Sequence, residues 1–120
     1  NGYLYIVDRL KDMVVTGGEN VFTTEVENAL ISHAAVQDVS VIGIPHEKWG
    51  EAVHAIVILH EGASVSEEEL IAHCRKNIAD YKIPKGFTFR EEPMPLSGAG
   101  KVLKTELRKP FWDGLDRQVN

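Results

Sequence analysis

Hydrophobic residues recur along the chain with spacings that distinguish strand-like segments from helix-like ones. Residues 3–7 and 13–15 are short runs rich in β-forming side chains, and the polar residues 8–12 between them are typical of a turn. The adjacent glycines within residues 16–20 predict a break in regular structure, because glycine tolerates positive φ angles. The first part of the chain therefore predicts a short two-stranded hairpin.

Helical spacing follows in two segments, each opened by a capping-box pattern. Thr24 is followed three residues later by Glu27, and Ser66 is followed by Glu69 in the same way. One face of the first helix is formed by Val26, Ala29, Leu30 and His33, and the stripe of the second by Ile71, Cys74 and Ile78. Both segments are predicted to be amphipathic helices with one buried face.

Three further segments have the composition of strands, at residues 36–44, 52–60 and 87–90. The second of them is apolar on both faces, which favours a central position in a sheet. Residues 102–109 predict a last short helix. This order of elements describes an α+β domain with a small mixed sheet of about three strands, covered by helices and preceded by the hairpin.

Composition and charge narrow the class of protein. With 120 residues the chain has room for one domain with its own core. The formal net charge of -5 argues against a general binder of nucleic acid or of membrane surfaces, since such partners favour a basic face. No apolar run approaches the roughly 20 residues needed to cross a bilayer. The single cysteine excludes an intramolecular disulfide and favours a reducing, cytoplasmic location, and the start at Asn1 suggests a piece of a longer protein.

The histidines, the cysteine and the glutamates at 67–69 could in principle bind a metal or take part in catalysis, but each has a structural explanation. The five histidines lack the spacing of metal ligands on one helix, so no metal site is expected. His54 and His60 are predicted to lie on strand faces. Cys74 falls on the apolar stripe of a helix, where core packing explains it better than nucleophilic catalysis. The three glutamates at 67–69 form a favourable first helical turn.

The strongest single signal for chemistry is Lys101, which ends the sequence Ser-Gly-Ala-Gly-Lys at 97–101. A lysine on a glycine-rich loop can enter another site as a mobile cation and offset negative charge on carboxylate or phosphate oxygens. An exposed lysine in a flexible turn has the same local pattern. The loop alone therefore leaves both interpretations open.

Four motifs occur in a fixed order: Tyr-Ile-Val-Asp-Arg-Leu-Lys-Asp at 5–12, Thr-Gly-Gly-Glu-Asn-Val at 16–21, Glu-Val-Glu at 25–27 and Gly-Lys at 100–101. Together they resemble the C-terminal domain of the adenylate-forming superfamily, which includes acyl-CoA synthetases, luciferases and the adenylation domains of peptide synthetases. The resemblance extends from Tyr5 to Phe111. Residues 18–20 and 109–112 are more similar to fatty acyl-CoA ligases than to luciferases.

The resemblance implies a lid that works in two positions. Lys101 matches the family's adenylation lysine, which contacts the substrate carboxylate and the α-phosphate side of ATP. Arg9 matches an arginine that reaches the nucleotide ribose, a task suited to its several donors. Lys11 lies at the family's hinge. Residues 1–11 would then be a hinge-proximal strand and hinge, and residues 12–120 the mobile C-terminal lid.

The resemblance also implies a surface that contacts coenzyme A. Gly17 and Gly18 would line the pantetheine tunnel, where the absence of side chains permits close approach. Trp49, Tyr81 and Lys85 match aromatic and basic residues that contact the coenzyme in related ligases.

Local alternatives stay open for this surface. The glycine pair could form a simple β-to-α turn, and Trp49 could be a packing residue on the loop between two strands. Lys82 is interpreted as a solvated neighbour. Ile83 stands where relatives carry arginine, which puts one phosphate contact in doubt.

The implied function is that of the C-terminal domain of an ATP-dependent acyl-CoA synthetase. Such a ligase converts a carboxylate, here expected to be a fatty acid, into acyl-adenylate and then into acyl-CoA, with ATP, coenzyme A and Mg²⁺. The phosphate-binding loop and acyl pocket would belong to an N-terminal adenylating domain of the same polypeptide, so this chain is expected to be inactive alone. The alternatives are a lid that loads the pantetheine of a carrier protein and a stand-alone nucleotide-binding module.

Overall fold

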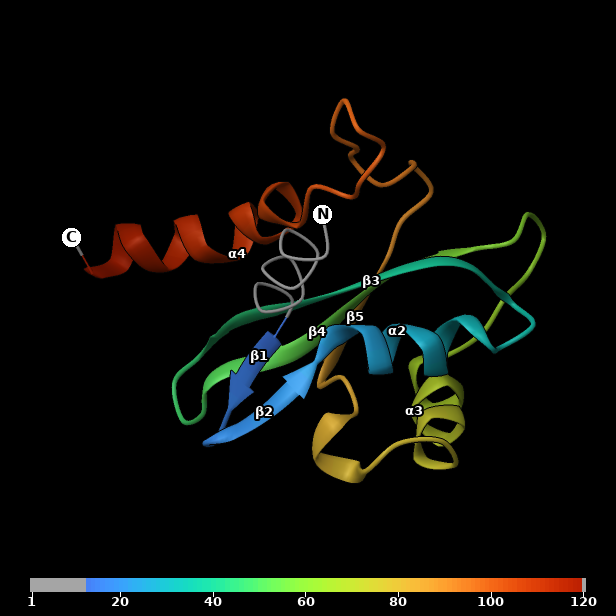
Figure 1. Cartoon of the computed structure of the whole chain (residues 1–120), viewed down its shortest axis with the longest axis horizontal. Helices are drawn as coiled ribbons and strands as arrows, with labels where there is room; N and C mark the ends of the chain where they lie inside the picture. The colour runs from blue at the N-terminus through green and yellow to red at the C-terminus, as the bar shows by residue number, and fades with distance from the viewer. Residues whose placement is uncertain (1–12, 120) are drawn as a thin grey trace.

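The computed structural model describes residues 13–119, with side chains described through residue 112. This part of the chain forms a five-stranded sheet flanked by helices (Figure 1). The strands are β1 (Met13–Thr16), β2 (Glu19–Phe22), β3 (Val36–His46), β4 (Gly50–Leu59) and β5 (Gly86–Phe89). The strand predicted at residues 3–7 lies outside the described residues.

The strands are arranged in the order β2-β1-β4-β3, and β5 pairs with β4. The paired strands are antiparallel except for β4 and β5, which are parallel. The predicted α+β class and mixed sheet are therefore confirmed. The sheet has five strands instead of about three because the hairpin of β1 and β2 is part of it. Thr16 of β1 pairs with Gly50 of β4.

The hairpin itself differs from its prediction. Residues 16–20 were expected to interrupt regular structure, but Thr16 ends β1 and Glu19 already begins β2. Only Gly17 and Gly18 lie outside the two strands. The polar residues of β2, Glu19 and Asn20, are both exposed, while Val21 is fully buried.

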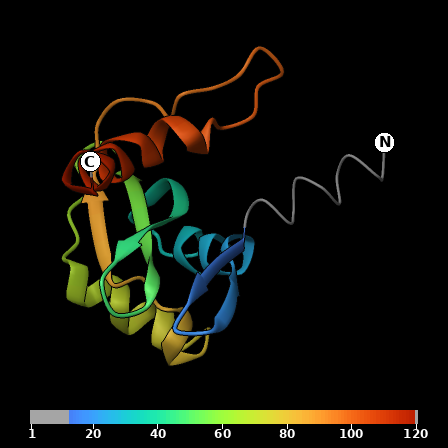
Figure 2. The ribbon, with the colours of Figure 1, turned by 90° about the vertical axis from the view of Figure 1, so that its left-hand side faces the viewer.

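The sheet is covered on both faces, which explains the apolar character of β4. One core contains alternate residues of β4 together with residues from α2 (Thr23–Ile31) and α3 (Glu67–Arg75). The opposite core contains Ile56 and Ile58 of β4 with Leu107 of α4 (Lys104–Val119). The predicted central strand is confirmed, and Figures 1 and 2 show α4 on the side of the sheet away from α2 and α3.

One of the two predicted capping boxes forms its cap and the other does not. The Ser66 hydroxyl accepts a hydrogen bond from the Glu69 N–H at 3.2 Å, as predicted. The helix α2 begins at Thr23, one residue before the expected cap, and its N-cap residue Phe22 makes no side-chain cap. The Glu27 carboxylate is engaged elsewhere, so the Thr24 prediction is wrong.

The last two elements shift slightly from their predicted bounds. The strand expected at 87–90 is β5, one residue earlier. The helix expected at 102–109 begins at Lys104 and continues to Val119. Pro110 lies inside this helix, where its missing N–H removes one backbone hydrogen bond without ending the helix.

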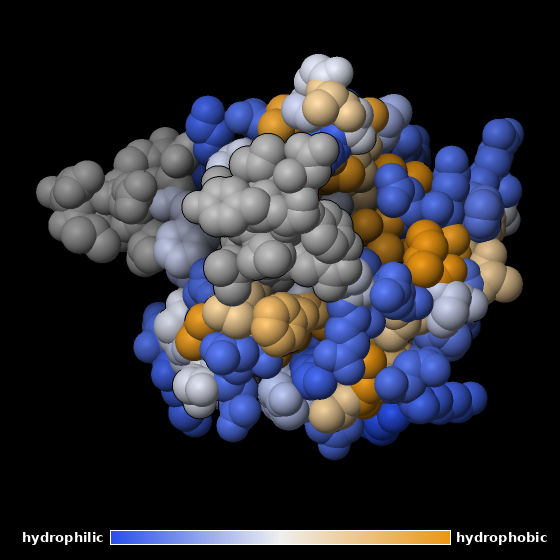
Figure 3. Space-filling view, viewed as in Figure 1, coloured by the Kyte–Doolittle hydropathy of each residue, from blue (hydrophilic) through white to orange (hydrophobic). Residues whose placement is uncertain are grey.

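The molecular surface is mixed in character. In the view of Figure 3, hydrophobic side chains are interspersed with hydrophilic ones. Among residues 13–112, the exposed large hydrophobic side chains are Val15, Phe22, Ile31, Tyr81, Phe89 and Leu96. Across residues 13–119, no helix has both the length and the apolar character needed to traverse a membrane.

Candidate functional site: a lysine loop and a glycine turn

The lysine loop, residues 95–103, is a tight turn closed at its base by main-chain hydrogen bonds. Leu96 pairs with Val102 as an isolated antiparallel bridge. Within the loop the Ser97 N–H donates to the Lys101 carbonyl at 2.8 Å, and the Ser97 hydroxyl accepts from the Lys101 N–H at 3.3 Å. Gly100 adopts a φ of 84°, which favours glycine. Ser97 therefore fixes the main chain of Lys101 although the surrounding sequence is glycine-rich.

The lysine loop projects from the body of the domain (Figure 2). Lys101 is exposed in this loop, as are its neighbours Gly98 to Gly100. A cation in this position can approach oxygen atoms that belong to another domain. The glycine-rich turn considered from the sequence is thus a loop closed by hydrogen bonds, with an exposed lysine.

The second feature, the glycine turn, is the two-residue connection between β1 and β2. Gly17 and Gly18 have φ angles of 57° and 82°, the pair of positive values typical of a type I′ hairpin turn. The connection therefore joins two strands and is not a β-to-α turn. Both glycines are exposed, so the surface at this point consists of main-chain atoms.

Trp49 anchors the glycine turn. The Gly17 N–H donates to the Trp49 carbonyl at 3.0 Å. The Trp49 ring stacks on His46 with 4.3 Å between centroids, and the His46 Nδ1 accepts from the Trp49 N–H at 3.2 Å. The ammonium of Lys85 lies 5.2 Å from the centre of the Trp49 ring. The structure thus brings Gly17, Trp49 and Lys85 together. The Trp49 ring packs against His46 and remains partly exposed.

Tyr81 lies in the short helix η1 (Asp80–Lys82), which Figure 1 shows below the start of α2. Its side chain is 42% exposed. Lys82, expected to be a solvated neighbour, forms an ion pair with Glu25 at 2.8 Å, and this partner raises the pKa of the Lys82 ammonium. Ile83 is buried in the core, so it offers no polar contact.

The lysine loop and the glycine turn lie at opposite ends of the domain (Figures 1 and 2). A partner on one side could therefore meet Lys101 in one orientation and the glycine turn in another. Arg9 and Lys11, the predicted nucleotide and hinge residues, lie outside the described residues.

An ionic cluster that the sequence did not reveal connects the lysine loop to the rest of the domain. The Lys104 ammonium lies 2.7 Å from Glu27 Oε2 and 3.0 Å from Thr23 Oγ1. The same carboxylate oxygen accepts from the Val41 N–H at 2.9 Å. Glu27 belongs to the Glu-Val-Glu motif identified in the sequence. Its partner Lys104 lies far away along the chain, so no local pattern predicts the pair.

The other end of the lysine loop is held by Arg90. Its guanidinium donates to the carbonyls of Glu92 and Pro93 at 3.0 and 2.9 Å. Further along the chain, Met94 is buried beneath α4 in the second core. The chain is thus held on both sides of the loop.

Two buried residues with reactive side chains have structural roles. Burial raises the pKa of the Cys74 thiol to about 11, which keeps it protonated and confirms its packing role. His54 is buried on β4 with its Nε2 2.7 Å from the Thr88 hydroxyl, and burial lowers its pKa. Between residues 13 and 119 no group of three or more histidine, cysteine, aspartate or glutamate side chains could hold a metal ion.

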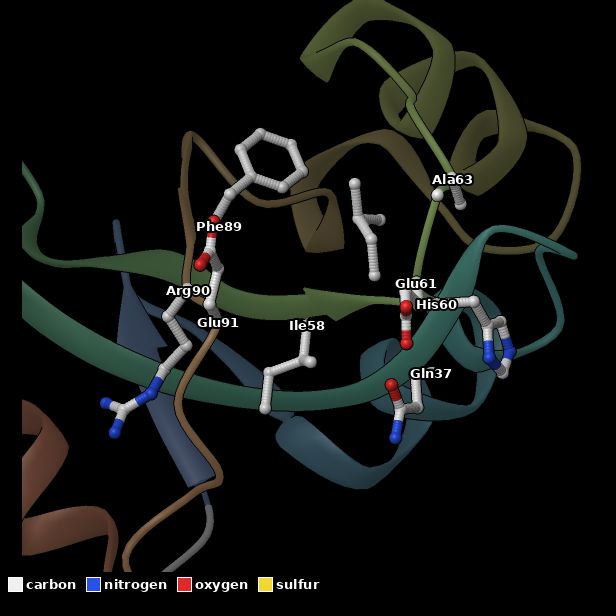
Figure 4. A pocket seen from close by; sticks show the side chains of 10 residues that line it. Gln37, Ile58, His60, Glu61, Ala63, Phe89, Arg90 and Glu91 are labelled. Atoms are coloured by element: carbon white, nitrogen blue, oxygen red, sulfur yellow. The ribbon is translucent and has the colours of Figure 1, made fainter.

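A shallow pocket of about 610 Å³ lies at the ends of β4 and β5, away from both functional features. Residues 58–63 and 89–91 line most of it (Figure 4). Figure 4 shows the Arg90 side chain directed away from His60 and Gln37. None of the predicted site residues lines this pocket.

Comparisons with known proteins agree with the motif resemblance. The pattern of the AMP-binding enzyme C-terminal domain family matches residues 25–101. A feruloyl-CoA synthase of Amycolatopsis sp is 43% identical over 111 residues, which cover 92% of this chain and 22% of that protein. The long-chain-fatty-acid–CoA ligase FadD13 of Mycobacterium tuberculosis is 47% identical over 110 residues, with the same coverage of 92% and 22%.

A solved structure gives the same result. The Mycobacterium tuberculosis fatty acyl CoA synthetase superposes with a TM-score of 0.79 at 45% identity, covering 86% of this chain and 20% of that one. The chain therefore spans about a fifth of the length of the proteins that it matches.

Proposed function

Because the chain belongs to the AMP-binding enzyme C-terminal domain family, we propose that it is the lid of an ATP-dependent acyl-CoA synthetase. The remaining part of the enzyme would be an N-terminal domain with the phosphate-binding loop and the acyl pocket. Residues 1–11 would form the hinge-proximal strand and hinge, and residues 12–120 the lid. The observation that carries the proposal is the exposed Lys101 in a projecting loop whose main chain is closed by hydrogen bonds.

In the first half-reaction, a carboxylate oxygen attacks the α-phosphorus of ATP. A new phosphorus–oxygen bond forms, and the bond to pyrophosphate breaks. The Lys101 ammonium would contact the carboxylate and the α-phosphate oxygens and offset the charge that develops there. Arg9 would bind the nucleotide ribose. An ordered main chain at Lys101 supports this role, since the cation must be placed accurately.

In the second half-reaction, the thiol of coenzyme A attacks the acyl carbonyl and AMP leaves. Gly17 and Gly18 would line the path of the pantetheine arm, because the turn presents main-chain atoms without side chains. Trp49, Tyr81 and Lys85 would contact the coenzyme near this path. The half-exposed Trp49 ring with a lysine ammonium 5.2 Å away supports a site for an anionic, aromatic ligand.

Rotation about Lys11 would present the two features in turn. Their positions at opposite ends of the domain support this mechanism (Figure 1). Mg²⁺ would accompany ATP through its phosphates and the N-terminal domain. The residues of the described part do not fit a metal-binding role, so no step is assigned to Mg²⁺ in this chain.

We propose a fatty acid as the carboxylate and the cytoplasm as the compartment. Similarity to a long-chain-fatty-acid–CoA ligase supports the substrate, although a feruloyl-CoA synthase is similar to a comparable degree. The single cysteine, which rules out an intramolecular disulfide, supports a reducing compartment.

The test is a substrate survey with the full polypeptide that carries this chain. Fatty acids of several lengths and ferulate are each supplied with ATP, and acyl-adenylate formation is measured. Coenzyme A and a pantetheine-bearing carrier protein are then compared as acceptors. Turnover with a fatty acid and free coenzyme A is expected. Turnover only with the carrier protein would contradict the assigned acceptor, and ATP binding without any adenylate formation would contradict ligase activity.

A further inference from the structure

The lysine loop continues directly into α4, whose first residue makes the ionic cluster described above. Lys104 follows Lys101 by three positions and has a side chain only 12% exposed. Its ammonium contacts the Glu27 carboxylate at 2.7 Å and the Thr23 hydroxyl at 3.0 Å, both in α2. The start of α4 is therefore fixed to a helix on the other side of the sheet.

Glu27 is held by its own helix and by a strand of the sheet. Its backbone belongs to α2, and its Oε2 atom accepts a hydrogen bond from the Val41 N–H of β3 at 2.9 Å. The carboxylate is 22% exposed, so solvent screens the pair less than it would a surface ion pair. Removal of the lysine would leave a partly buried carboxylate without its counter-ion.

The contacts inside the lysine loop fix its shape but not its direction from the sheet. The bridge between Leu96 and Val102 and the hydrogen bond from the Leu103 N–H to the Pro95 carbonyl, at 2.8 Å, are both internal to the loop and its base. The direction depends on the segments that enter and leave the loop. On the leaving side, Lys104 provides a polar contact to α2, and further along α4 the Trp112 indole N–H donates to the Gly43 carbonyl of β3 at 3.0 Å.

The same cluster is linked to the glycine turn through β2, which runs from the turn to the start of α2. Thr23 directly follows β2, the strand that leads away from Gly18. Lys104 thus connects the segment that follows Lys101 to α2, the helix that follows the hairpin of β1 and β2. A lid that presents two features in turn benefits from holding them in one rigid body, because each hinge rotation then places both accurately.

We propose that Lys104 is a positioning residue for adenylation, acting through Lys101, and that Glu27 is its obligatory partner. This inference rests on the proposed role of Lys101. Lys104 is not assigned a contact with substrate, because its ammonium is engaged by Glu27 and its side chain is largely buried.

The test uses the full polypeptide and measures the two half-reactions separately. Lys104→Met keeps the length of the side chain and removes its charge. It is expected to lower kcat for adenylation by about tenfold, with KM for ATP little changed, because a small displacement of a catalytic group has effects of this order. Thioester formation from supplied acyl-adenylate is expected to stay within about twofold, and Lys104→Arg should restore most of the adenylation rate.

Glu27→Gln provides a second route to the same result. The glutamine oxygen can still accept from the Val41 N–H, so the variant removes the charge while retaining the contact that packs β3 against α2. The same selective loss is expected, and the double variant Glu27→Gln with Lys104→Met should be little worse than either single variant. Matched controls are Lys109→Met and Glu68→Gln, which make the same chemical changes at exposed helical positions in α4 and α3.

The outcomes separate this inference from the proposed function. Equal loss in both half-reactions, no loss relative to the two controls, or failure of Lys104→Arg to restore adenylation would each overturn the positioning role. If Lys101→Ala leaves adenylation intact, the proposed function of the loop fails first. If Lys101→Ala abolishes adenylation but Lys104→Met and Glu27→Gln match their controls, only the positioning role fails.

Discussion

Three exposed glycines have nearly the same backbone conformation. Alanine substitutions at these positions should therefore destabilise the protein equally, which allows the glycine turn and the lysine loop to be compared. Gly18, Gly62 and Gly100 have φ angles of 82°, 81° and 84°. A Cβ atom added at any of them meets nothing within 4 Å. Gly18 lies in the glycine turn and Gly100 in the lysine loop, whereas Gly62 lies in a surface loop outside both. Substitution by alanine therefore introduces backbone strain without a steric clash at all three positions.

The stability cost follows from the φ angle. An alanine at positive φ costs roughly 1–2 kcal/mol in the folded state. The substitution also restricts the unfolded chain, which returns about 0.4–1 kcal/mol. The net loss is therefore about 1 kcal/mol for each variant, or a fall in Tm of about 4 °C for a domain of this size.

The functional effects are expected to differ although the stability effects agree. Gly18→Ala should slow thioester formation by about tenfold, because a methyl group enters the pantetheine path, while adenylation stays within about twofold. Gly100→Ala should show the reverse selectivity, and Gly62→Ala should leave both half-reactions unchanged. Thermal unfolding and the two half-reactions, measured on the full polypeptide, provide the assay. The reasoning is refuted if Gly18→Ala and Gly100→Ala impair the same half-reaction, or if Gly62→Ala is as damaging as either.

Two further predictions concern buried groups. Burial holds the pKa of His54 below 6.5 in the folded state, so the unfolded chain binds a proton at this residue first as the pH falls. The stability of the folded state should therefore decline from about pH 6.5 downward. The variant His54→Gln should flatten that decline, as measured by thermal unfolding at a series of pH values. An unchanged pH profile in His54→Gln would contradict this. The Cys74 thiol is fully buried and has a pKa of about 11, so it should react with iodoacetamide at pH 8 only after denaturant is added. Mass spectrometry detects the labelled protein. Rapid labelling of the folded protein would show that the thiol is accessible.

A buried element could be predicted from the sequence where many of its residues gave the same signal. The strand β4 was identified as central because both of its faces are apolar, and both prove to be covered. Local rules failed where a distant group competed for the same side chain. Thr24 and Glu27 match a capping box, but Glu27 instead meets Val41 and Lys104, which are far away in the sequence.

The same distinction applies to the candidate site. Lys101 and the glycine pair could be proposed from the sequence because their motifs are contiguous. The contact of Trp49 with Lys85 and the cluster of Lys104 with Glu27 could not, because they depend on how β3, β4 and the helices pack. The strand β2 was missed for a similar reason, since Glu19 is favourable in a strand only where a neighbouring strand pairs with it.

The most direct measurement compares Lys101→Ala with Lys109→Ala in the intact enzyme, with pyrophosphate release followed separately from the conversion of purified acyl-adenylate to thioester. Loss of the first activity by about a hundredfold or more in Lys101→Ala, with the second retained, is the predicted result. A Lys101→Ala enzyme that releases pyrophosphate as fast as Lys109→Ala, or that loses both activities to the same extent, would show that this lysine is not the cation that serves adenylation.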